Sequence, residues 1–275
     1  MSRNTWYVVL SLSLLFSTAA WNLTAQETKS AFHWPDGKRV AVSLSFDDGR
    51  ASQVDTGLDV INPTGVKVTF FVNPPAVKEH LNGWKRAVAS GHEIGSHSVT
   101  HPCTGNFPWS AQNALEDYTL DRMSKQLDDA SAQIHELLGV NPVTFGYPCG
   151  QKFVGRGPEM KSYVPLIGQK FLVGRGYMDE YYNDPLVCDL AQAGGIAFDD
   201  MDYVDMVKHI TKSAQQGGWV IFAGHDIGQK KFQCTDTIAL AALCRYMKDP
   251  ANGIWVDTVE NIAKYVIKQR AALGK

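Results

Sequence analysis

The sequence has no excess of charge of either sign, because 26 lysines and arginines are balanced by 28 aspartates and glutamates. These charges are mixed along the chain, so no basic surface is predicted that would bind a phosphate backbone or an anionic lipid. The sequence also contains no internal repeat and no low-complexity linker. We therefore expect no nucleic acid partner and a single folded domain.

The sequence has few cysteines and no CxxC pair, so a structural zinc site built from thiolates is not expected. Any metal should instead be held by nitrogen and oxygen ligands. In an oxidising compartment an odd number of cysteines leaves at least one thiol unpaired. The cysteines are Cys103, Cys149, Cys188, Cys234 and Cys244.

The only long apolar run lies at the N-terminus, where Arg3 precedes the apolar stretch Trp6–Phe16 and the small residues Ser17–Ala20. This order predicts a signal peptide over residues 1–25, cleaved after Ala20 or Ala25. The run has about 11 residues, whereas a bilayer span needs about 20. We expect an exported protein, periplasmic or secreted, with no membrane span after signal cleavage.

The rest of the chain, residues 26–275, contains enough apolar residues for one large core, since 44% of the sequence is hydrophobic. Short runs rich in Val, Ile and Phe alternate with longer segments of helical periodicity, which indicates a parallel sheet. The expected strands are Val40–Phe46, Val66–Val72, Glu93–Ser96, Val143–Tyr147, Phe171–Val173, Trp219–Gly224 and Ile254–Val256. The expected helices are Ser52–Ile61, Pro75–Ser90, Ala111–Leu138, Tyr203–Gln216, Asp236–Tyr246 and Val259–Ala272.

Six or seven such units favour a closed or nearly closed (β/α) barrel with seven strands over an open sheet. In both architectures ligands bind at the carboxyl ends of the strands. The residues that directly follow each expected strand are therefore the candidates for chemistry.

Two adjacent carboxylates, Asp47 and Asp48, follow the first expected strand and precede Gly49. Neighbouring side chains at a strand end point in different directions, so one carboxylate can ligate a cation while the other takes a proton from water. An acidic turn closed by Gly49 is the simpler alternative for this motif alone.

Two histidines, His97 and His101, lie four residues apart as the chain leaves the third expected strand. One helical turn would place both imidazoles on one face, where together with Asp48 they would form a His, His, Asp ligand set for a divalent cation. Surface polarity is the alternative, but the glycine-containing segment before His97 is unlike an exposed helix. His92 has no partner at ligand spacing and is expected to make a structural hydrogen bond.

A third histidine, His225, follows the apolar strand Trp219–Gly224. At a strand end it can protonate a leaving group, with Asp226 or another carboxylate orienting its ring.

Taken together, these segments resemble the motifs of the polysaccharide deacetylases, the fourth family of carbohydrate esterases, also known as NodB-homology domains. Leu44–Gly49 is similar to the first motif, His97–His101 to the second, Phe145–Gly150 to the third and Ala223–His225 to the fifth. They occur in the family's order and extend over most of the chain after the signal segment.

The resemblance implies a distorted (β/α) barrel that removes acetyl groups from an N-acetyl amino sugar polymer or an O-acetylated polysaccharide. Asp47 would be the base, His225 the acid, and Asp48 with both second-motif histidines the ligands of zinc or of a similar cation such as cobalt or nickel. The Cys149 N–H would stabilise the oxyanion, with Tyr147 and Pro148 beside it in the groove wall.

Three departures from the family pattern concern details of the site. Position 146 is glycine where the third motif has an arginine that pairs with the base, so Arg156 or Arg175 would have to supply that charge. Ala223 stands where the fifth motif has leucine, which leaves room for larger acyl groups. The fourth motif is not evident, and Asp199, Asp200 and Asp202 are candidates to orient His225.

Other interpretations stay open on these residues. Cys103 lies just after the second motif and Cys149 lies within the third, so a disulfide between them is one alternative to free thiols. A nucleophilic Cys149 is not expected. The chain could also be a glycan-binding domain without turnover, which the missing arginine favours, or a deacylase of a small non-carbohydrate amide or ester. The sequence gives no indication of an oligomeric state.

Overall fold

The computed structural model describes residues 32–229 and 232–275, which belong to one compact unit, Phe32–Lys275. The predicted signal peptide, residues 1–25, lies outside the described residues. Among the described residues, no helix is long and apolar enough to cross a membrane.

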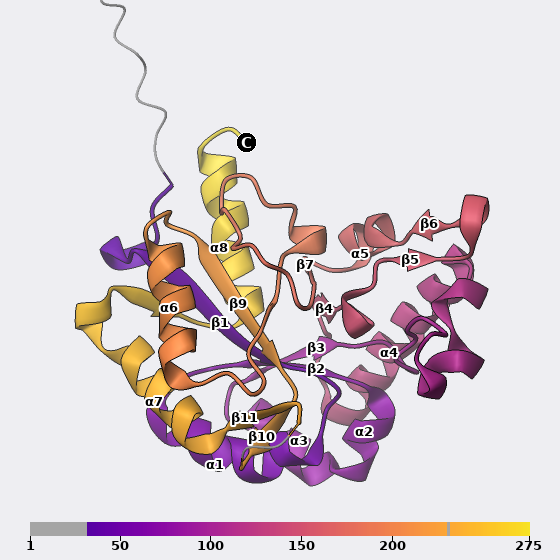
Figure 1. Cartoon of the computed structure of the whole chain (residues 1–275), viewed down its shortest axis with the longest axis horizontal. Helices are drawn as coiled ribbons and strands as arrows, with labels where there is room; N and C mark the ends of the chain where they lie inside the picture. Colours follow the sequence, from indigo (N-terminus) through magenta and orange to yellow (C-terminus); the bar gives the residue numbers. More distant parts are fainter. Residues whose placement is uncertain (1–31, 230–231) are drawn as a thin grey trace, which may run out of the picture. The chain divides into compact units, whose positions relative to one another are not determined.

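The centre of the fold is a curled sheet in which all paired strands are parallel (Figure 1). Seven strands lie side by side in the order β7-β4-β3-β2-β1-β9-β8, and β12 pairs beside the start of β1. The bounds are β1 Val40–Phe46, β2 Thr69–Val72, β3 Glu93–Ser96, β4 Thr144–Gly146, β7 Val173–Arg175, β8 Ile196–Ala197, β9 Trp219–Gly224 and β12 Ile254–Val256.

The two edges of this sheet approach each other. Arg175 at the end of β7 forms a parallel bridge with Ala193, three residues before β8, and the amide of Gly176 donates to the Ala193 carbonyl at 2.7 Å. The predicted (β/α) barrel is confirmed as a curled parallel sheet, with β8 rather than β12 completing the seven-stranded path.

Helices cover the outside of the sheet and follow one another along its strands (Figure 1). Their bounds are α1 Leu58–Ile61, α2 Pro74–Glu79, α3 Leu81–Ala89, α4 Leu120–Leu138, α5 Val164–Lys170, α6 Tyr203–Ala214, α7 Thr237–Lys248 and α8 Val259–Ala272. The expected helix Ala111–Leu138 begins only at Leu120, because Thr119 accepts from the Arg122 amide as N-cap and shorter 3-10 segments precede it.

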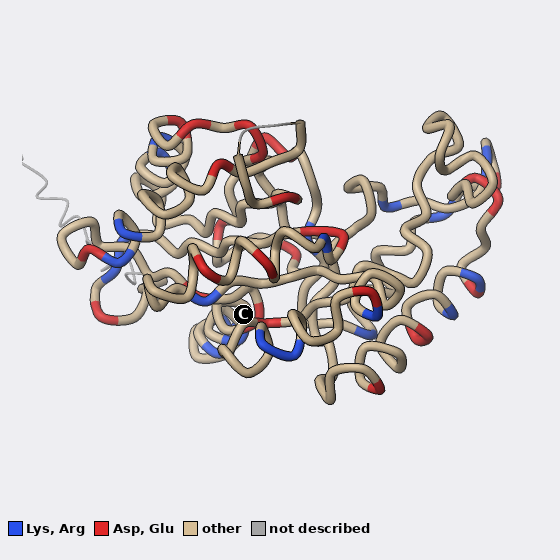
Figure 2. The backbone as a smooth tube through the Cα atoms, turned by 90° about the horizontal axis from the view of Figure 1, so that it is seen from below, with Lys and Arg blue, Asp and Glu red and all other residues tan. Residues whose placement is uncertain are grey.

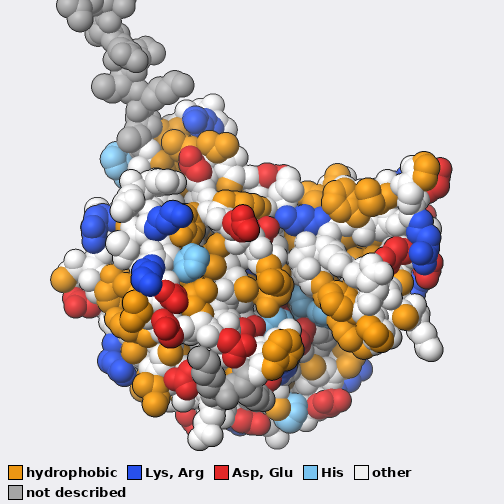
Figure 3. Space-filling view, viewed as in Figure 1, with side chains coloured by type: hydrophobic (Ala, Val, Ile, Leu, Met, Phe, Trp, Pro, Cys, Tyr) orange, Lys and Arg blue, Asp and Glu red, His pale blue; other side chains and the backbone are white. Residues whose placement is uncertain are grey.

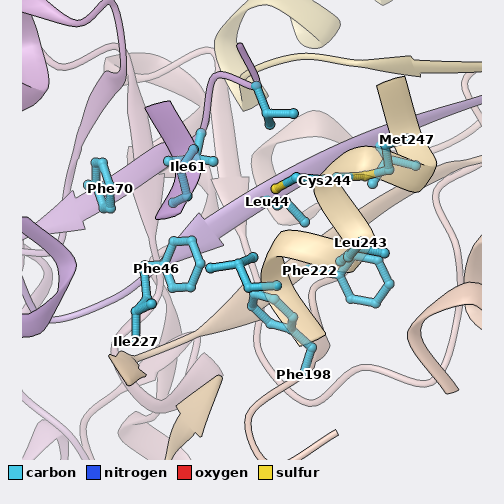
Figure 4. Close-up of a cluster of buried hydrophobic side chains, with 14 of the residues drawn as sticks. Leu44, Phe46, Ile61, Phe70, Phe198, Phe222, Ile227, Leu243, Cys244 and Met247 are labelled. Carbon is cyan, nitrogen blue, oxygen red and sulfur yellow. The ribbon is translucent and has the colours of Figure 1, made fainter. Parts of the chain in front are cut away.

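The core lies on both faces of the sheet, as expected for a parallel sheet. Every residue of β1 is buried. Figure 4 shows Leu44 of β1 and Phe222 of β9 close to Leu243 and other side chains of α7, and the Phe46 ring of β1 lies 5.4 Å from that of Phe198. Burial of each such large side chain contributes about 1.5–3 kcal/mol, so this packing holds the strand ends in place.

A separate small lobe stands beside the carboxyl end of β4. It consists of the antiparallel pair β5 Phe153–Val154 and β6 Lys161–Ser162 together with α5 and the start of α4 (Figure 1). Its core includes Leu115, Tyr118, Tyr147 and Tyr163. A second short pair, β10 Asp226–Gly228 and β11 Cys234–Asp236, follows β9.

Acidic and basic residues are mixed along the backbone, without a continuous stretch of basic residues in this view (Figure 2). The mixed charge of the sequence is therefore also mixed in space.

Candidate active site

A cavity of about 840 Å³ lies at the carboxyl ends of the strands. Each of the seven side-by-side strands, or the loop that directly follows it, supplies lining residues, as the parallel architecture predicts. The contributions are Asp47 and Asp48 from β1, Asn73 from β2, His97 from β3, Cys149 from β4, Tyr177 from β7, Ala197 and Asp199 from β8, and His225 from β9.

The three predicted ligands converge on one point of this cavity. Oδ1 of Asp48 lies 3.5 Å from Nε2 of His97 and 3.3 Å from Nε2 of His101, and the three ligand atoms lie within 4.8 Å of one another. Nδ1 of His97 is paired with the Gly146 carbonyl at 2.8 Å, so this ring nitrogen carries the proton and Nε2 is left as a free ligand atom. The donor set therefore fits a divalent cation bound by two imidazoles and one carboxylate.

The two histidines converge by a turn and not by the predicted helical turn. Ser98 and His101 have left-handed φ values of 64° and 48°, and no helix includes residues 97–101. Nδ2 of Asn73 donates to the carbonyls of His97 and Ser98 at 2.7 and 2.9 Å, and the Ser98 hydroxyl accepts from the His101 amide at 3.1 Å. These bonds fix the non-helical turn over residues 97–101 that brings the two imidazoles together.

The electrostatics of the triad favour the protonation states that bind a metal. Burial, with a smaller contribution from neighbouring His97, lowers the pKa of His101 to about 4, so its ring is neutral at neutral pH. Burial acts to raise the pKa of Asp48, but interactions with His97 and the other histidines of the site hold that pKa well below its ordinary value. Asp48 is therefore a carboxylate.

Asp47 lines the same cavity and is paired with Arg175, one of the two candidate arginines, which lies on β7 and not at the third-motif position on β4. Nη2 of Arg175 bonds Oδ1 of Asp47, and the Arg175 side chain is fully buried. In the sheet, Arg175 is the direct partner of Gly146, and a Cβ at position 146 would lie 2.8 Å from Nη2 of Arg175. Glycine at position 146 thus leaves the space that Arg175 fills.

The other candidate arginine, Arg156, is excluded by its position. It is exposed and pairs with Asp117 on the surface at 2.8 Å. Of the two arginines named from the sequence, only Arg175 reaches Asp47.

His225 is oriented by Asp199. Nδ1 of His225 lies 2.5 Å from Oδ2 of Asp199, and the His225 amide donates to Oδ1 of the same carboxylate at 2.9 Å. Burial acts to lower the pKa of His225, but the bond with Asp199 and the charges of Asp47 and Asp199 raise it above its ordinary value. His225 is therefore favoured in its protonated form, as a proton donor requires.

The other carboxylates considered for this role are engaged elsewhere. Asp226 accepts from Arg50 at 3.1 Å and from the Ser52 hydroxyl at 2.6 Å. Asp200 accepts from the Gln233 amide, and Asp202 caps the N-terminus of α6. The open assignment of the orienting acid is resolved in favour of Asp199.

Two further residues of the site were not predicted from the sequence. Nε and Nη2 of Arg50 donate to Oδ2 of Asp48 at 3.0 and 2.8 Å, which leaves Oδ1 turned toward the histidines. Nε2 of Gln53 donates to the carbonyls of Asp47 and His225 at 2.6 and 2.9 Å and so joins the two strand ends. The only sequence signal for either residue is its place just after the Asp-Asp-Gly motif.

The predicted groove is only partly correct. Cys149 lines the cavity, but Tyr147 and Pro148 are buried, and the Tyr147 hydroxyl donates to the Ala191 carbonyl at 2.6 Å. The prediction that Tyr147 lies in the groove wall is wrong, because this ring is fully buried in the core of the small lobe. Ala223 is fully buried and is not among the lining residues.

The cysteine alternatives are resolved as well. Cys103 and Cys149 form a disulfide, whereas Cys188, Cys234 and Cys244 are not in disulfides. His92, as expected, has a structural role, since it accepts from the Val68 amide at 3.2 Å and pairs with Asn62 at 2.8 Å.

Backbone strain is concentrated at the cavity. Of the eight non-glycine residues with left-handed φ among those described, six line it. They are Asp48, His101, Cys149, Met178, Asp200 and Gln233. Each such conformation costs about 1–3 kcal/mol and persists only where surrounding contacts enforce it, a pattern typical of functional sites.

Apolar side chains border the cavity on its open side (Figure 3). The rings of Phe107 and Trp109 stack at 5.3 Å, and Trp109, with 62% of its surface exposed, lies 5.8 Å from the ring of His101. Met178 and Phe232 are 71% and 84% exposed at the same cavity. An exposed apolar rim of this kind is suited to a ligand with apolar faces.

Residues 35–155 match the sequence model of the family described as polysaccharide deacetylase. The match covers less than half of the chain and shows that this segment is similar to that family. It includes both aspartates, the two ligand histidines and Cys149, whereas Arg175, Asp199 and His225 lie beyond it.

Among curated proteins, the chain is similar to the peptidoglycan-N-acetylglucosamine deacetylase PgdA of Listeria monocytogenes, with 46% identity over 66 residues. That alignment covers 24% of this chain and 14% of the relative. The chain spans less than half the length of the curated relatives it matches, from 4% to 41%.

Solved structures of the family share the fold. The peptidoglycan deacetylase PdaC of Bacillus subtilis has a TM-score of 0.55 and 22% identity, with 87% of this chain and 96% of that chain covered. A protein of Bacillus anthracis described as a CE4 family pseudoenzyme has a TM-score of 0.51 and 17% identity, with 82% and 66% covered. At these identities the likeness concerns the fold.

Proposed function

We propose that this chain is a metal-dependent deacetylase that hydrolyses acetyl groups on a carbohydrate, either an N-acetylated amino sugar polymer or an O-acetylated polysaccharide. The observation that carries the proposal is the convergence of Asp48, His97 and His101 beside Asp47, with His225 in the same cavity. A ligand set, a base and an acid are thus present together.

The ligand set suits zinc, with cobalt or nickel as alternatives, because imidazole and carboxylate bind these borderline cations. A cation held there would polarise the acyl carbonyl and lower the pKa of the attacking water. Asp48 is fixed for this role by Arg50, which occupies its second oxygen.

The protein groups perform the remaining steps of the proposed hydrolysis. Asp47, held by Arg175, takes the proton of the attacking water. The Cys149 N–H donates to the oxyanion that develops on the acyl oxygen. His225, charged and oriented by Asp199, gives its proton to the departing amine or alkoxide. No covalent intermediate with the protein is needed.

Two observations support the proposed substrate class, namely the exposed apolar side chains around the cavity and the similarity to known deacetylases. Trp109 is exposed beside His101 and offers a flat apolar face to a sugar ring. The similarity to a deacetylase of peptidoglycan N-acetylglucosamine supports an N-acetyl amino sugar as the first substrate to test.

Acetate release tests this function against the two alternatives. The chain without its signal segment is stripped of metal, reconstituted with zinc, and given acetylated chitin oligomers, peptidoglycan fragments, acetylated xylan and a small aryl acetate. Zinc-dependent release from a carbohydrate is expected. No release from any substrate would support a glycan-binding domain, and release from the aryl acetate alone would support a small-molecule deacylase.

The glycan-binding alternative depended on a missing arginine. Because Arg175 pairs with Asp47, that argument no longer favours it.

We also propose that the protein is exported. The signal segment predicted over residues 1–25 and the disulfide between Cys103 and Cys149 both suit an oxidising compartment. Expression of the full chain in a bacterial host, followed by mass spectrometry of the secreted and periplasmic fractions, should show an N-terminus at Trp21 or Gln26. An intact N-terminus confined to the cytoplasm would contradict export.

A further inference from the structure

A disulfide connects two loops of the cleft that come from different strands. Cys103 lies two residues after His101, and Cys149 follows β4 and lines the cavity. The Thr104 amide also donates to Oε1 of Gln151 at 2.7 Å across these two loops. The disulfide is thus a direct covalent link between the ligand loop and the loop of the proposed oxyanion donor.

The Cys103 end of this link is firmly anchored without the disulfide. The Ser110 hydroxyl accepts from the Cys103 amide at 3.0 Å and donates to the Cys103 carbonyl at 2.9 Å. The same carbonyl accepts from the Leu115 amide at 2.9 Å, and both Cys103 and Ser110 are buried. The Cys103 backbone is therefore held by these bonds when the sulfur bond is absent. Sγ of Cys103 also lies 3.7 Å from Nδ1 of His101, so zinc affinity has to be measured in the variants that lose this contact.

The Cys149 end has the opposite character. Its φ of 54° is left-handed, which is unfavourable for a residue with a Cβ. Within the part of the chain that the structure describes, no bond from the Cys149 amide to a protein acceptor is present, although the next two amides bond the carbonyls of Tyr147 and Pro148. An unfavourable backbone conformation with an unpaired N–H at the cavity needs an external restraint.

We propose that Cys103 is a positioning residue, and that its disulfide holds the Cys149 amide in the orientation that serves the acyl oxygen. The inference rests on the proposed function, because it assigns the disulfide to the oxyanion step of that reaction. Loss of the bond should let Cys149 relax toward negative φ and turn its N–H away. Turnover should then fall while the metal centre stays intact.

Two double variants of the full chain separate this role from general stabilisation. Cys103→Ala/Cys149→Ala removes the bond and keeps a Cβ at position 149, whereas Cys103→Ala/Cys149→Gly removes the bond but lets the backbone adopt left-handed φ freely. The matched control is Cys188→Ala, which removes a free thiol outside the cavity.

The expected result is a loss of kcat of about 10- to 1,000-fold in the alanine variant, the range for a misplaced or missing oxyanion donor. KM and the dissociation constant for zinc should change less than about threefold. The glycine variant should recover part of kcat, and the control should match the wild type. Unchanged kcat in the alanine variant, or a glycine variant no better than alanine, would overturn the proposal.

Reduction of the wild type provides a further comparison if a variant does not fold. Zinc content is measured alongside kcat, because the two thiols lie close enough to His101 to bind the cation themselves. One molecule of dithiothreitol is oxidised to its cyclic disulfide, and Cys103 and Cys149 each gain a hydrogen atom. After removal of the dithiol and restoration of zinc, kcat should be lower than in the oxidised protein. Recovery of full kcat with the thiols still reduced would contradict the positioning role.

Amide hydrogen exchange distinguishes failure of this inference from failure of the proposed function. If the oxidised wild type releases no acetate from any substrate, the proposed function fails, but exchange still reports on the loop. In the alanine variant, exchange should accelerate in residues 147–151 and stay unchanged in residues 97–101. Equal exchange in both proteins over residues 147–151 would refute the restraint by itself.

Discussion

Asp47 and Asp48 are neighbours in sequence with different contacts, so their substitutions should have different effects. Asp47→Asn should keep zinc and lose most turnover, because its carboxylate pairs with Arg175 and does not belong to the ligand triad. His97→Ala should lose zinc first, since it removes one of three ligands. Zinc content by atomic spectroscopy together with kcat would check this, and equal zinc loss in both variants would refute the division of roles.

Arg175 is predicted to maintain the proposed base. Arg175→Gln should lower kcat by about 100-fold, because it leaves the buried Asp47 carboxylate without its cationic partner. The matched control is Arg156→Gln, since that arginine pairs only with an exposed carboxylate. Unchanged kcat in a folded Arg175→Gln variant would contradict this role.

The pH dependence should reveal the link between His225 and Asp199. Because the pKa of His225 is raised, the ring stays protonated at pH values where an ordinary histidine is neutral, and donor activity is lost only as pH rises through the raised pKa. Asp199→Asn removes the bond and charge that raise it, so the alkaline limb of kcat should move to lower pH. The control is Asp200→Asn, another cavity carboxylate that bonds Gln233 instead. An unmoved limb in Asp199→Asn would contradict the assignment.

At the residue scale, a site residue could be predicted from the sequence where it directly follows a single apolar strand. Asp47, Asp48 and His225 each follow a recognisable apolar run, so their placement at the cavity could be predicted. Arg175 was only one of two candidates to pair with Asp47, because the choice between them depends on the register between β4 and β7. Non-local pairing of this kind has no local sequence signal.

At the element scale, Glu93 connects three parts of the fold. Its carboxylate accepts from the hydroxyls of Thr69 and Thr144, from β2 and β4, and from the Glu260 amide at the start of α8. Glu93→Ala should lower the free energy of unfolding by about 3 kcal/mol, because buried donors would lose their acceptor. Urea unfolding would measure it.

Glu93→Gln, which keeps one acceptor oxygen, should cost less than the alanine variant. Glu93 lies at the start of β3, away from His97 just beyond its end, so kcat of the folded protein should be unchanged. A large loss of kcat in a well-folded Glu93→Ala would show that this cluster also shapes the site.

The elements that were not predicted from hydrophobic periodicity are too short to show a periodic pattern. β8 has only Ile196 and Ala197, and it belongs to the sheet because those two residues pair with β9. The small lobe similarly depends on short strands and 3-10 segments. Its packing against Tyr147 explains why the groove prediction was wrong at that residue.

At the scale of the whole molecule, the proposed metal should stabilise the fold. Asp48 comes from the end of β1 and both histidines from the end of β3, so the complete ligand set exists only when the sheet is formed. A cation that binds only the folded chain, at a concentration 1,000 times its dissociation constant, adds about 4 kcal/mol. For a domain of this size the gain corresponds to an increase in Tm of about 10 °C.

Chelation should therefore lower the Tm of the wild type and of Asp47→Asn by a similar amount, because both keep the three ligands. It should leave the Tm of His97→Ala almost unchanged, since that variant has little metal affinity to lose. Differential scanning calorimetry with zinc or with a chelator would measure all three. If chelation lowered the Tm of His97→Ala as much as that of the wild type, the stabilising metal would have to bind elsewhere, and the convergence of Asp48, His97 and His101 would need another explanation.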